Sequence, residues 1–351
     1  MTNITGKRGK PSRRVRLEDL AAQCGVSTAT VSRALAGEPG VRPDIRARVK
    51  AAARAANYAM PSSIAGRKVI LAASSAAMID YVRNQFTAYV LEGVQQRALA
   101  LGIEIVSRPI SNRDDELRVL DEARQDDAVA GLLFLTLDDE EMLAATRGFE
   151  KPVVLLNGED PLMRLSSVTP CNRSAARLAT DHLIGLGHER ILFLMRPGRR
   201  TIERRLEGWQ DALRHHGLGA APDLIVTVDD WLPALATSAI AERINTRGLD
   251  FTAVFAAGDA LAVGAALAVQ QAGFSVPGDV AIMGMDDLPQ AAFLNPPLTT
   301  MHIPMREIGA AALDLLRDGL TGFPMPPRRL ELACHIVERQ STAPVRRMAA
   351  Q

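Results

Sequence analysis

The chain has 351 residues, of which 47% are hydrophobic and 23% are charged, an ordinary composition for a soluble protein of two or three domains. Its net charge of +1 conceals an asymmetry, because residues 1–68 hold 14 Lys and Arg against 4 Asp and Glu, whereas the remainder holds 27 against 36. A small basic module and a larger acidic module therefore share the chain, and the basic module is suited to a polyanion. A disordered basic tail is the simpler interpretation, but residues 17–58 have helical periodicity.

Cysteine and histidine usage excludes several classes of site. Cys24, Cys171 and Cys334 lie far apart without a CxxC pattern, which predicts a reducing compartment and no disulfide framework. The histidines have no metal-ligand spacing, so we expect no metal and no other cofactor. The first 15 residues lack the apolar core of a secretory signal, and no apolar run approaches the ~18 residues that span a bilayer. We therefore expect a cytoplasmic protein that does not bind membranes.

The basic module is predicted to contain three helices after a basic N-terminal tail, residues 1–15. Residues 17–24 carry one apolar stripe, and Gly25 suits the left-handed turn after a helix. Ser27 is a good N-cap for a second helix, whose apolar side consists of Val31, Ala34 and Leu35. Pro43 begins a third helix, whose buried stripe consists of Ile45, Val49, Ala52, Ala53 and Ala56. This order predicts a helix-turn-helix domain over residues 16–58.

The other side of the second helix is small and polar, with Thr28, Ala29, Ser32 and Arg33. Small side chains at its start let the backbone approach the floor of a DNA major groove. Arg33, one turn beyond Ala29, can reach guanine O6 and N7 or a phosphate. Phosphates also suit the hydroxyls of Ser27, Thr30 and Ser32. A three-helix bundle that binds another protein is the alternative, which the local positive charge disfavours.

Residues 16–58 resemble the DNA-binding headpiece of the LacI/GalR family of bacterial transcription regulators, most specifically in "GVSTATVSRALAG". The resemblance places base-reading positions on Thr28, Ala29 and Arg33, and it matches Tyr58 to the tyrosine of a Y-x-P motif. Two positions depart from the family pattern. Ala36 stands where Asn is usual, and Arg42 stands where a Ser N-cap is usual.

In the family, a short hinge helix after this tyrosine inserts a leucine into the minor groove. The matching segment, residues 59–68, contains no leucine, and Ile64 is the only candidate wedge. Gly66 weakens a helix there, and Pro61 is displaced by one residue. We therefore expect only modest bending of the DNA.

From residue 69 onward, apolar runs alternate with helical stripes. The runs lie at 69–73, 103–106, 131–135, 152–156, 191–195, 224–228, 252–256 and 279–283, and the stripes include 86–101, 174–186, 204–216 and 259–272. Such alternation predicts parallel sheets covered on both faces. Some eight strands exceed one compact unit, so we expect two doubly wound α/β lobes over residues 69–342 and a tail at 343–351. A ligand would bind at the carboxyl ends of the strands, in the crevice between the lobes.

This region also resembles the effector-binding core of the same family, which is similar to periplasmic sugar-binding proteins. The landmarks are "LATDHLIGLGHERILFL", "RRLEGWQDAL", "AVFAAGDALAVGAALAVQQAGFSVPGDVAIMGMDD" and "PPLTTMHIP". The resemblance runs from about residue 16 to Thr342. By landmark, it implies effector contacts at Phe86, Asn157, Arg205, Trp231, Gly258 and Asp286.

The chemistry of these positions suits a polar ligand. A guanidinium such as that of Arg205 presents a fixed fork of donors for hydroxyls or a carboxylate, and Asp286 supplies acceptors. Trp231 falls where some family members stack a ring on the sugar face. Asn157 replaces a common Asp, and Gly258 replaces an Asn that many members carry. Since that amide is missing, we expect a ligand smaller or more acidic than a plain hexose.

The sequence therefore predicts a sequence-specific transcriptional repressor rather than an enzyme. It is expected to form a homodimer on a pseudo-palindromic operator, controlled by a small effector, a sugar or a sugar-derived acid. A purine or another metabolite acting as co-repressor is the alternative. An enzyme on the same scaffold is disfavoured because no G-x-S-x-G, Walker A or HExxH motif occurs. A periplasmic binding protein is disfavoured by the headpiece and the missing signal peptide.

Overall fold

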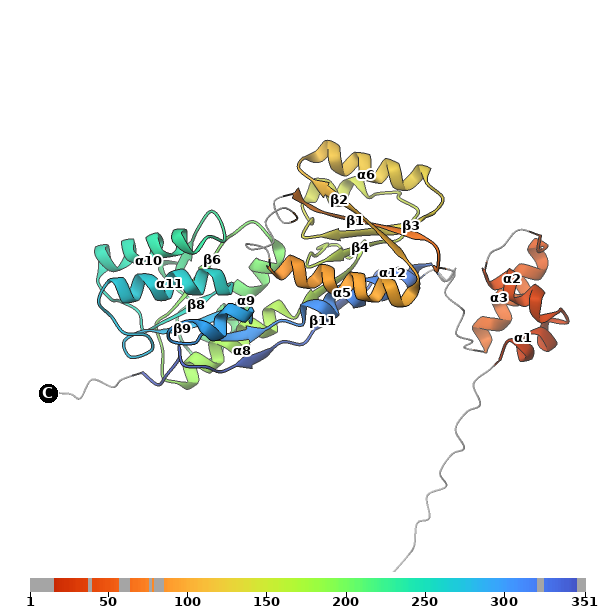
Figure 1. The fold of residues 1–351 in the computed structure, drawn as a ribbon. Helices are drawn as coiled ribbons and strands as arrows, with labels where there is room; N and C mark the ends of the chain where they lie inside the picture. The colour runs from red at the N-terminus through yellow and green to blue at the C-terminus, as the bar shows by residue number, and fades with distance from the viewer. Residues whose placement is uncertain are drawn as a thin grey trace, which may run out of the picture. The chain divides into compact units, whose positions relative to one another are not determined.

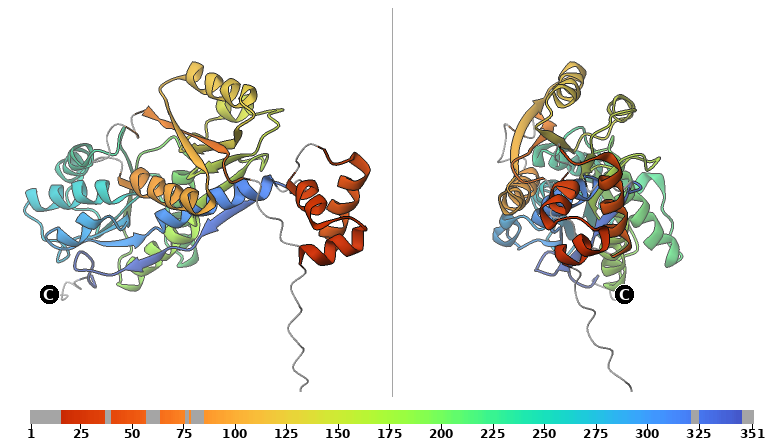
Figure 2. Two further views of the ribbon diagram at one scale, coloured as in Figure 1. Left: turned by 45° about the vertical axis from the view of Figure 1, so that its right-hand side comes forward. Right: turned by 90° about the vertical axis from the view of Figure 1, so that its right-hand side faces the viewer.

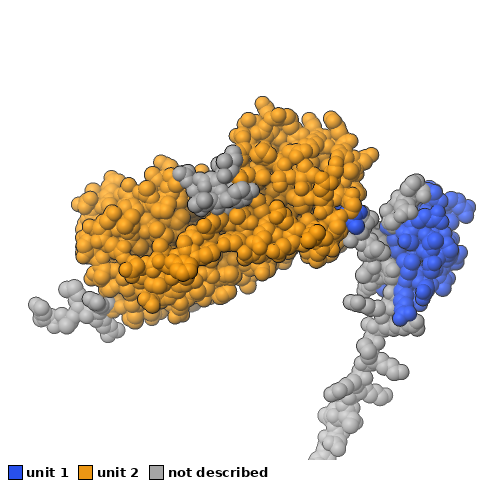
Figure 3. All heavy atoms as spheres, viewed as in Figure 1, with its two compact units in different colours: residues 1–65, 319–323 blue, residues 66–318, 324–351 orange. Residues whose placement is uncertain are grey.

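The structure, a computed structural model, describes residues 16–36, 40–56, 64–75, 78, 85–320 and 325–345. The chain divides into two compact units, residues 1–65 with 319–323 and residues 66–318 with 324–351 (Figure 3). The first contains the headpiece, and the second contains the α/β core.

The headpiece consists of α1 (Leu17–Cys24), α2 (Thr28–Ala36) and α3 (Pro43–Ala55). Gly25 ends α1 in the left-handed conformation, with a φ of 58° that a residue lacking Cβ adopts without strain. Ser27 caps α2, because its Oγ accepts the N–H of Thr30 at 3.1 Å. The predicted helix-turn-helix and its turn chemistry are confirmed.

The apolar stripes of the three helices form one small core. Leu20 of α1, Val31 of α2 and Val49 of α3 are completely buried in it. Arg48 also donates from Nη2 to the carbonyl oxygen of Cys24 at 3.0 Å, which ties α3 to the end of α1. The predicted apolar sides of these helices therefore face one another and leave the polar side of α2 exposed.

The core contains two six-stranded sheets (Figure 1). We call the first sheet and its helices the N-lobe and the second sheet and its helices the C-lobe. The N-lobe strands, in spatial order, are β11 (Arg329–Leu332), β5 (Ser166–Pro170), β4 (Val153–Leu156), β3 (Val129–Leu135), β1 (Lys68–Ser74) and β2 (Glu104–Ile110). The C-lobe strands are β12 (His335–Val337), β10 (Thr299–His302), β9 (Ala281–Asp286), β8 (Ala253–Ala256), β6 (Ile191–Met195) and β7 (Ile225–Thr227).

Helices cover these sheets (Figures 1 and 2). Those of the N-lobe are α5 (Gln85–Leu101), α6 (Arg113–Gln125), α7 (Glu140–Ala145) and α12 (Met305–Gly319). Those of the C-lobe are α8 (Asn172–Gly185), α9 (Arg200–His215), α10 (Pro233–Arg247) and α11 (Asp259–Gln271), with short 3-10 turns at Pro222–Leu224 and Pro289–Phe293. All strand pairs are parallel except β10 with β12, and β3, β4, β6 and β8 are wholly buried. The predicted pair of parallel-sheet lobes is confirmed.

The expected number of strands was wrong. The described residues form twelve strands rather than some eight, and the additional ones are β5, β10, β11 and β12. β5 and β10 are rich in Ser and Thr, and β11 and β12 are short, partly exposed edge strands. None of the four carries the continuous apolar run by which the buried strands were recognised.

The chain passes between the lobes three times. It leaves the N-lobe after β5 and enters α8, returns after β10 to α12, and passes again from β11 to β12. Helix α12 lies beside α5 of the N-lobe, as the views of Figures 1 and 2 agree, and Arg306 donates from Nε to Glu92 at 2.8 Å. Each lobe is therefore assembled from separate stretches of sequence.

Glycines bring neighbouring helices of the core unusually close. A Cβ added to Gly208 of α9 would lie 2.1 Å from the carbonyl oxygen of Arg173 in α8. A Cβ added to Gly264 of α11 would lie 2.2 Å from the carbonyl oxygen of Pro233 in α10. One added to Gly309 of α12 would lie 2.1 Å from the carbonyl oxygen of Val90 in α5. Only a residue without a side chain fits at these three crossings.

Candidate nucleic-acid interface and effector crevice

One face of α2 carries the predicted DNA contacts. Thr28, Ala29, Ser32 and Arg33 are exposed, and Thr30 is partly exposed. Arg33 folds back along this face, with its Nε 3.4 Å from the carbonyl oxygen of Ala29. The hydroxyls of Ser27 and Thr30 lie 2.9 Å apart at the start of the helix. Small residues, hydroxyls and one guanidinium thus share a surface shaped for a major groove.

The hinge residues of the prediction are described only in part. Tyr58 lies outside the described residues. Ile64 is 1% exposed, so its side chain would have to leave this buried position before entering a minor groove. Both assignments remain predictions.

Arg205 of α9, a predicted effector contact, is buried in the C-lobe. The side chain is 4% exposed, and its Nε donates to Asn172 Oδ1 at 2.8 Å while Nη1 donates to the carbonyl oxygen of Ala257. Burial lowers the pKa of the guanidinium, and the nearby negative charge of Asp286 opposes that shift. Two fixed acceptors therefore hold the group so that its remaining donors are preorganised for a ligand.

Asp286, at the end of β9, has a φ of 152°, a conformation that residues other than glycine rarely adopt. Its Oδ2 accepts the N–H of Asp259 at 3.3 Å. Burial, and then the negative charge of Asp259, raise the pKa of Asp286 well above its ordinary range, whereas Arg205 lowers it. The carboxyl group can therefore offer acceptors or, when protonated, a donor to a ligand.

Gly258 lies between two of the predicted contacts. A Cβ added to it would lie 3.1 Å from the Trp231 ring and 3.4 Å from Asp286 Oδ2. The carbonyl oxygen of the preceding residue, Ala257, accepts the hydrogen bond from Arg205 Nη1. The structure thus brings Arg205, Trp231, Gly258 and Asp286 together at the carboxyl ends of β8 and β9.

Asn157 of the N-lobe is linked to the C-lobe through Arg199. It follows β4 in the left-handed conformation, with a φ of 48° that Asn tolerates better than most residues. Arg199 of the C-lobe donates from Nη2 to the carbonyl oxygen of Asn157, and its Nε lies 3.8 Å from Asp138 Oδ1. Burial raises the pKa of Asp138, and Arg199 opposes that rise. Arg199 therefore bridges the two lobes at the crevice.

Several buried polar atoms around this crevice have no hydrogen-bond partner among the described residues. They are Asn157 Oδ1, Asn172 Nδ2 and Thr201 Oγ1. A buried polar atom without a partner costs about 1–3 kcal/mol, so these atoms favour a ligand or waters that satisfy them. Both a free acceptor and a free amide donor are present, which suits hydroxyl groups.

Phe86 is partly exposed in the first turn of α5, and within the described part of the chain no hydrogen bond or ring contact joins it to this cluster. Its role stays a prediction. The sequence also missed Asp138, Asn172, Arg199 and Asp259. Asp138 and Arg199 follow the carboxyl ends of β3 and β6, where ligands bind in such sheets, so a search for polar residues after the predicted strands could have found them.

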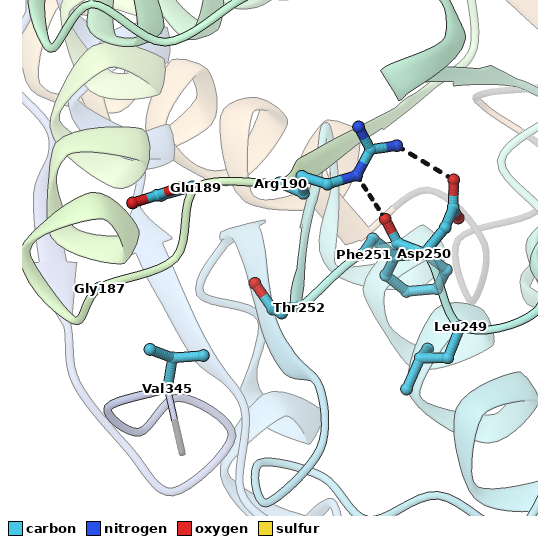
Figure 4. A pocket seen from close by; sticks show the side chains of 8 residues that line it. All are labelled: Gly187, Glu189, Arg190, Leu249, Asp250, Phe251, Thr252 and Val345. Carbon is cyan, nitrogen blue, oxygen red and sulfur yellow. Dashed lines mark hydrogen bonds and ion pairs between the residues drawn. The ribbon is translucent and has the colours of Figure 1, made fainter. Parts of the chain in front are cut away.

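A second hollow, of about 580 Å³, lies at the opposite end of the C-lobe sheet, beside Thr252 and Val345 (Figure 4). There Arg190 donates from Nε to the carbonyl oxygen of Asp250 at 2.6 Å and from Nη2 to its carboxylate at 3.1 Å. These polar groups already satisfy one another, and the predicted effector residues lie elsewhere.

Among the described residues, no helix combines the length and apolar character needed to cross a membrane, and no group of His, Cys, Asp and Glu is arranged to hold a metal. A helix-turn-helix headpiece joined to a two-lobed core with a polar crevice defines a class of protein, the ligand-responsive DNA-binding regulators.

Comparison with known proteins identifies the family. Residues 16–61 match "Bacterial regulatory proteins, lacI family", and residues 180–342 match "Periplasmic binding protein-like domain". The HTH-type transcriptional regulator MalR of Streptomyces coelicolor is 33% identical over 339 residues, covering 93% of this chain and 96% of MalR. The chain belongs to the lacI family of bacterial regulatory proteins. It is a transcriptional regulator and not an enzyme.

Two solved structures match nearly the whole chain. A complex of the transcriptional regulator CelR with cellobiose is 30% identical, with a TM-score of 0.71, and the match covers 93% of this chain and all of CelR. The lac repressor dimer bound to operator and an anti-inducer is 25% identical, with a TM-score of 0.70, and the match covers 94% of this chain and 100% of the repressor.

Proposed function

We propose that this regulator is a repressor whose affinity for operator DNA is controlled by a small polar effector, a sugar or a sugar-derived acid, bound between the lobes. The observation that carries the proposal is the convergence of Arg205 and Asp286 beside Trp231 and Gly258. The bound cellobiose of CelR and the operator-bound lac repressor are consistent with it.

The ionisable groups of Arg205 and Asp286 favour a polar ligand over an apolar one. Arg205 is already buried, so an apolar ligand would offer no new partner to its remaining N–H groups or to the Asp286 carboxyl group. A polyhydroxyl ligand or a hydroxy acid satisfies both groups, together with the unpartnered oxygen of Asn157. Trp231 offers a flat apolar face to the C–H side of a sugar ring. Gly258 supplies no amide, and Trp231 leaves little room for a side chain there, which favours a smaller or more acidic ligand than a plain hexose.

A thermal-shift panel of cellobiose, ribose, gluconate, glucuronate, adenine and guanine tests this proposal. We expect a sugar or sugar acid to raise the melting temperature and to release the protein from a DNA duplex selected from a random library. A purine that alone stabilises the protein and strengthens DNA binding would contradict it in favour of co-repression.

Arg33 gives a direct test of the recognition face. Arg33→Ala should weaken binding to the selected duplex by about 1–3 kcal/mol, because a bidentate contact to guanine is lost. Binding to a scrambled duplex should change much less. Fluorescence anisotropy at two salt concentrations distinguishes a guanine contact from a phosphate contact. Loss of a phosphate contact would weaken binding to both duplexes equally and reduce the salt dependence of binding. Equal affinity of variant and wild type for both duplexes would remove Arg33 from the interface.

We expect the protein to act as a homodimer, since two headpieces related by a two-fold axis read both halves of a pseudo-palindromic operator. Residues 343–351 contain no heptads that could assemble a tetramer. Sedimentation equilibrium at micromolar concentration should therefore give twice the chain mass of 37.8 kDa. A stable monomer or tetramer would contradict this expectation.

A further inference from the structure

Two of the three crossings between the lobes carry a cysteine. Cys171 lies directly after β5 and is the N-cap residue of α8, and Cys334 lies between β11 and β12. β5 and β11 are neighbouring parallel strands in which Pro170 pairs with Leu332. The N–H of Cys171 donates to the carbonyl oxygen of Leu332 at 2.9 Å, and the N–H of Cys334 donates to Cys171 Sγ at 3.3 Å.

This placement suits a covalent bond. Adjacent strands lie about 4.8 Å apart, and disulfides join residues whose Cα atoms are about 4.4–6.8 Å apart. Cys171 and Cys334 follow these strands by one and two residues, so the register places them side by side with an offset of one residue. The 3.3 Å contact between the Cys334 nitrogen and Cys171 Sγ keeps them close enough for a disulfide. Cys24, the remaining cysteine, is buried in the headpiece core.

The two thiols have different environments. Cys171 is partly exposed, whereas Cys334 is 8% exposed. Interaction with Cys334, whose N–H donates to Cys171 Sγ, lowers the pKa of Cys171 to about 6, against the effects of burial and of Glu331. Interaction with Cys171 and burial raise the pKa of Cys334, whose Sγ lies 3.8 Å from the carbonyl oxygen of Leu332. Cys171 is therefore the thiol of the pair that loses its proton more readily.

Cys171 is partly exposed and therefore open to a small reagent. A cavity of about 170 Å³ lies at the start of α8, beside residues that neighbour the pair in sequence, although neither cysteine lines it. It is lined by Glu159, Asn172, Arg173, Ser174, Arg204 and Glu331. Its volume exceeds the ~30 Å³ that a water molecule occupies in the liquid, so a small hydroperoxide fits.

We propose that Cys171 and Cys334 are a hydroperoxide-sensitive thiol pair whose disulfide ties two of the lobe crossings together. The Cys171 thiolate attacks one peroxide oxygen, the O–O bond breaks, and the leaving oxygen takes a proton to form an alcohol or, from hydrogen peroxide, water. Cys171 is then a sulfenic acid. The sulfur of Cys334 attacks it, the S–O bond breaks, and the hydroxide leaves with the thiol proton as water. The two sulfurs lose two electrons, and the peroxide gains them.

The disulfide would restrain the segments that join the N-lobe to the C-lobe. Opening and closing of two lobes requires the segments that join them to turn. A disulfide between Cys171 and Cys334 fixes two of these segments to each other. Cys334 also lies near Arg205, whose positive charge opposes the rise of the Cys334 pKa. Oxidation therefore changes the surroundings of a residue at the effector crevice.

Peptide mapping of the full-length protein tests the proposal. The reduced protein is treated at pH 7 with one equivalent of hydrogen peroxide, quenched by iodoacetamide and digested with trypsin. We expect the peptide of residues 165–173 to be joined to the peptide of residues 330–339, and dithiothreitol to separate them. The peptide of residues 17–33, which contains Cys24, should be alkylated rather than oxidised. Hydrogen–deuterium exchange of residues 171–174 should slow on oxidation.

Two variants assign the roles. Cys334→Ser should stop at the sulfenic acid of Cys171, which dimedone traps, whereas Cys171→Ser should react with neither peroxide nor dimedone. Cys24→Ala, the matched control, should form the disulfide as wild type does. In native wild-type protein, Cys171 should be alkylated at least tenfold faster than Cys24. The proposal is overturned if Cys24 and Cys171 react at similar rates, or if the only disulfides link different chains.

Discussion

Replacing Gly208 by alanine should destabilise the core by roughly 1–3 kcal/mol, the usual range for overpacking. Alanine normally favours a helix over glycine by about 0.5–1 kcal/mol. At Gly208, however, the added Cβ would lie 2.1 Å from the carbonyl oxygen of Arg173 and 2.9 Å from the Cβ of Ala176. Backbone cannot rotate out of the way as a flexible side chain can, so α8 and α9 must separate. The melting temperature, measured by calorimetry, should fall by several degrees.

Gly185 provides the matched control. It is the last residue of α8, and a Cβ added to it has no atom within 4 Å. Gly185→Ala should therefore be neutral or slightly stabilising. If Gly208→Ala were equally harmless, the close approach of α8 to α9 would have to relax at little cost, and the crossing would not be tightly packed.

Arg205→Ala should abolish most of the response to the effector while leaving DNA binding intact. The variant removes a charged donor from the crevice, and hydrogen bonds to charged groups contribute about 1.5–3 kcal/mol, which is about 10- to 100-fold in affinity. It also leaves Asn172 Oδ1 without its donor. Titration calorimetry with the ligand that emerges from the thermal-shift panel measures the loss, and anisotropy measures the release from DNA.

Two further variants separate the effects of charge, geometry and stability. Arg205→Lys keeps the charge but loses the planar fork, so it should recover only part of the affinity. Arg214→Ala changes an exposed arginine of the same helix, whose partner is Asp211, and should bind the effector as wild type does. If Arg205→Ala protein were released from DNA at the wild-type ligand concentration, Arg205 would be a structural residue and the crevice would have been placed wrongly.

The headpiece could be predicted almost completely from sequence because its determinants are local. Gly25 and Ser27 set the turn within one short segment, and the stripes of three neighbouring helices meet in one core. In the core, the family resemblance supplied Asp286 and Gly258 as predicted contacts, and the structure places them at the carboxyl ends of β9 and β8. Their role in binding an effector stays a prediction.

The remaining features depend on contacts between distant segments. Arg199 reaches Asn157, 42 positions earlier, and no local pattern indicates that bond. Most of the C-lobe sequence lies between β5 and its partner β11. The alternating, partly exposed residues of β11 do not distinguish it from a loop. The cysteine pair was missed for the same reason, since 163 positions separate Cys171 from Cys334.

The interleaving of the two lobes sets the order in which a nascent chain can fold. The headpiece draws its core from residues 17–56 alone, so it can fold soon after those residues leave the ribosome. The N-lobe sheet, in contrast, needs β11 at its edge and α12 against α5, both of which are synthesised after nearly all of the C-lobe. A DNA-reading module therefore exists on the growing polypeptide well before its sensor is complete. Translation that stops early yields a headpiece without effector control.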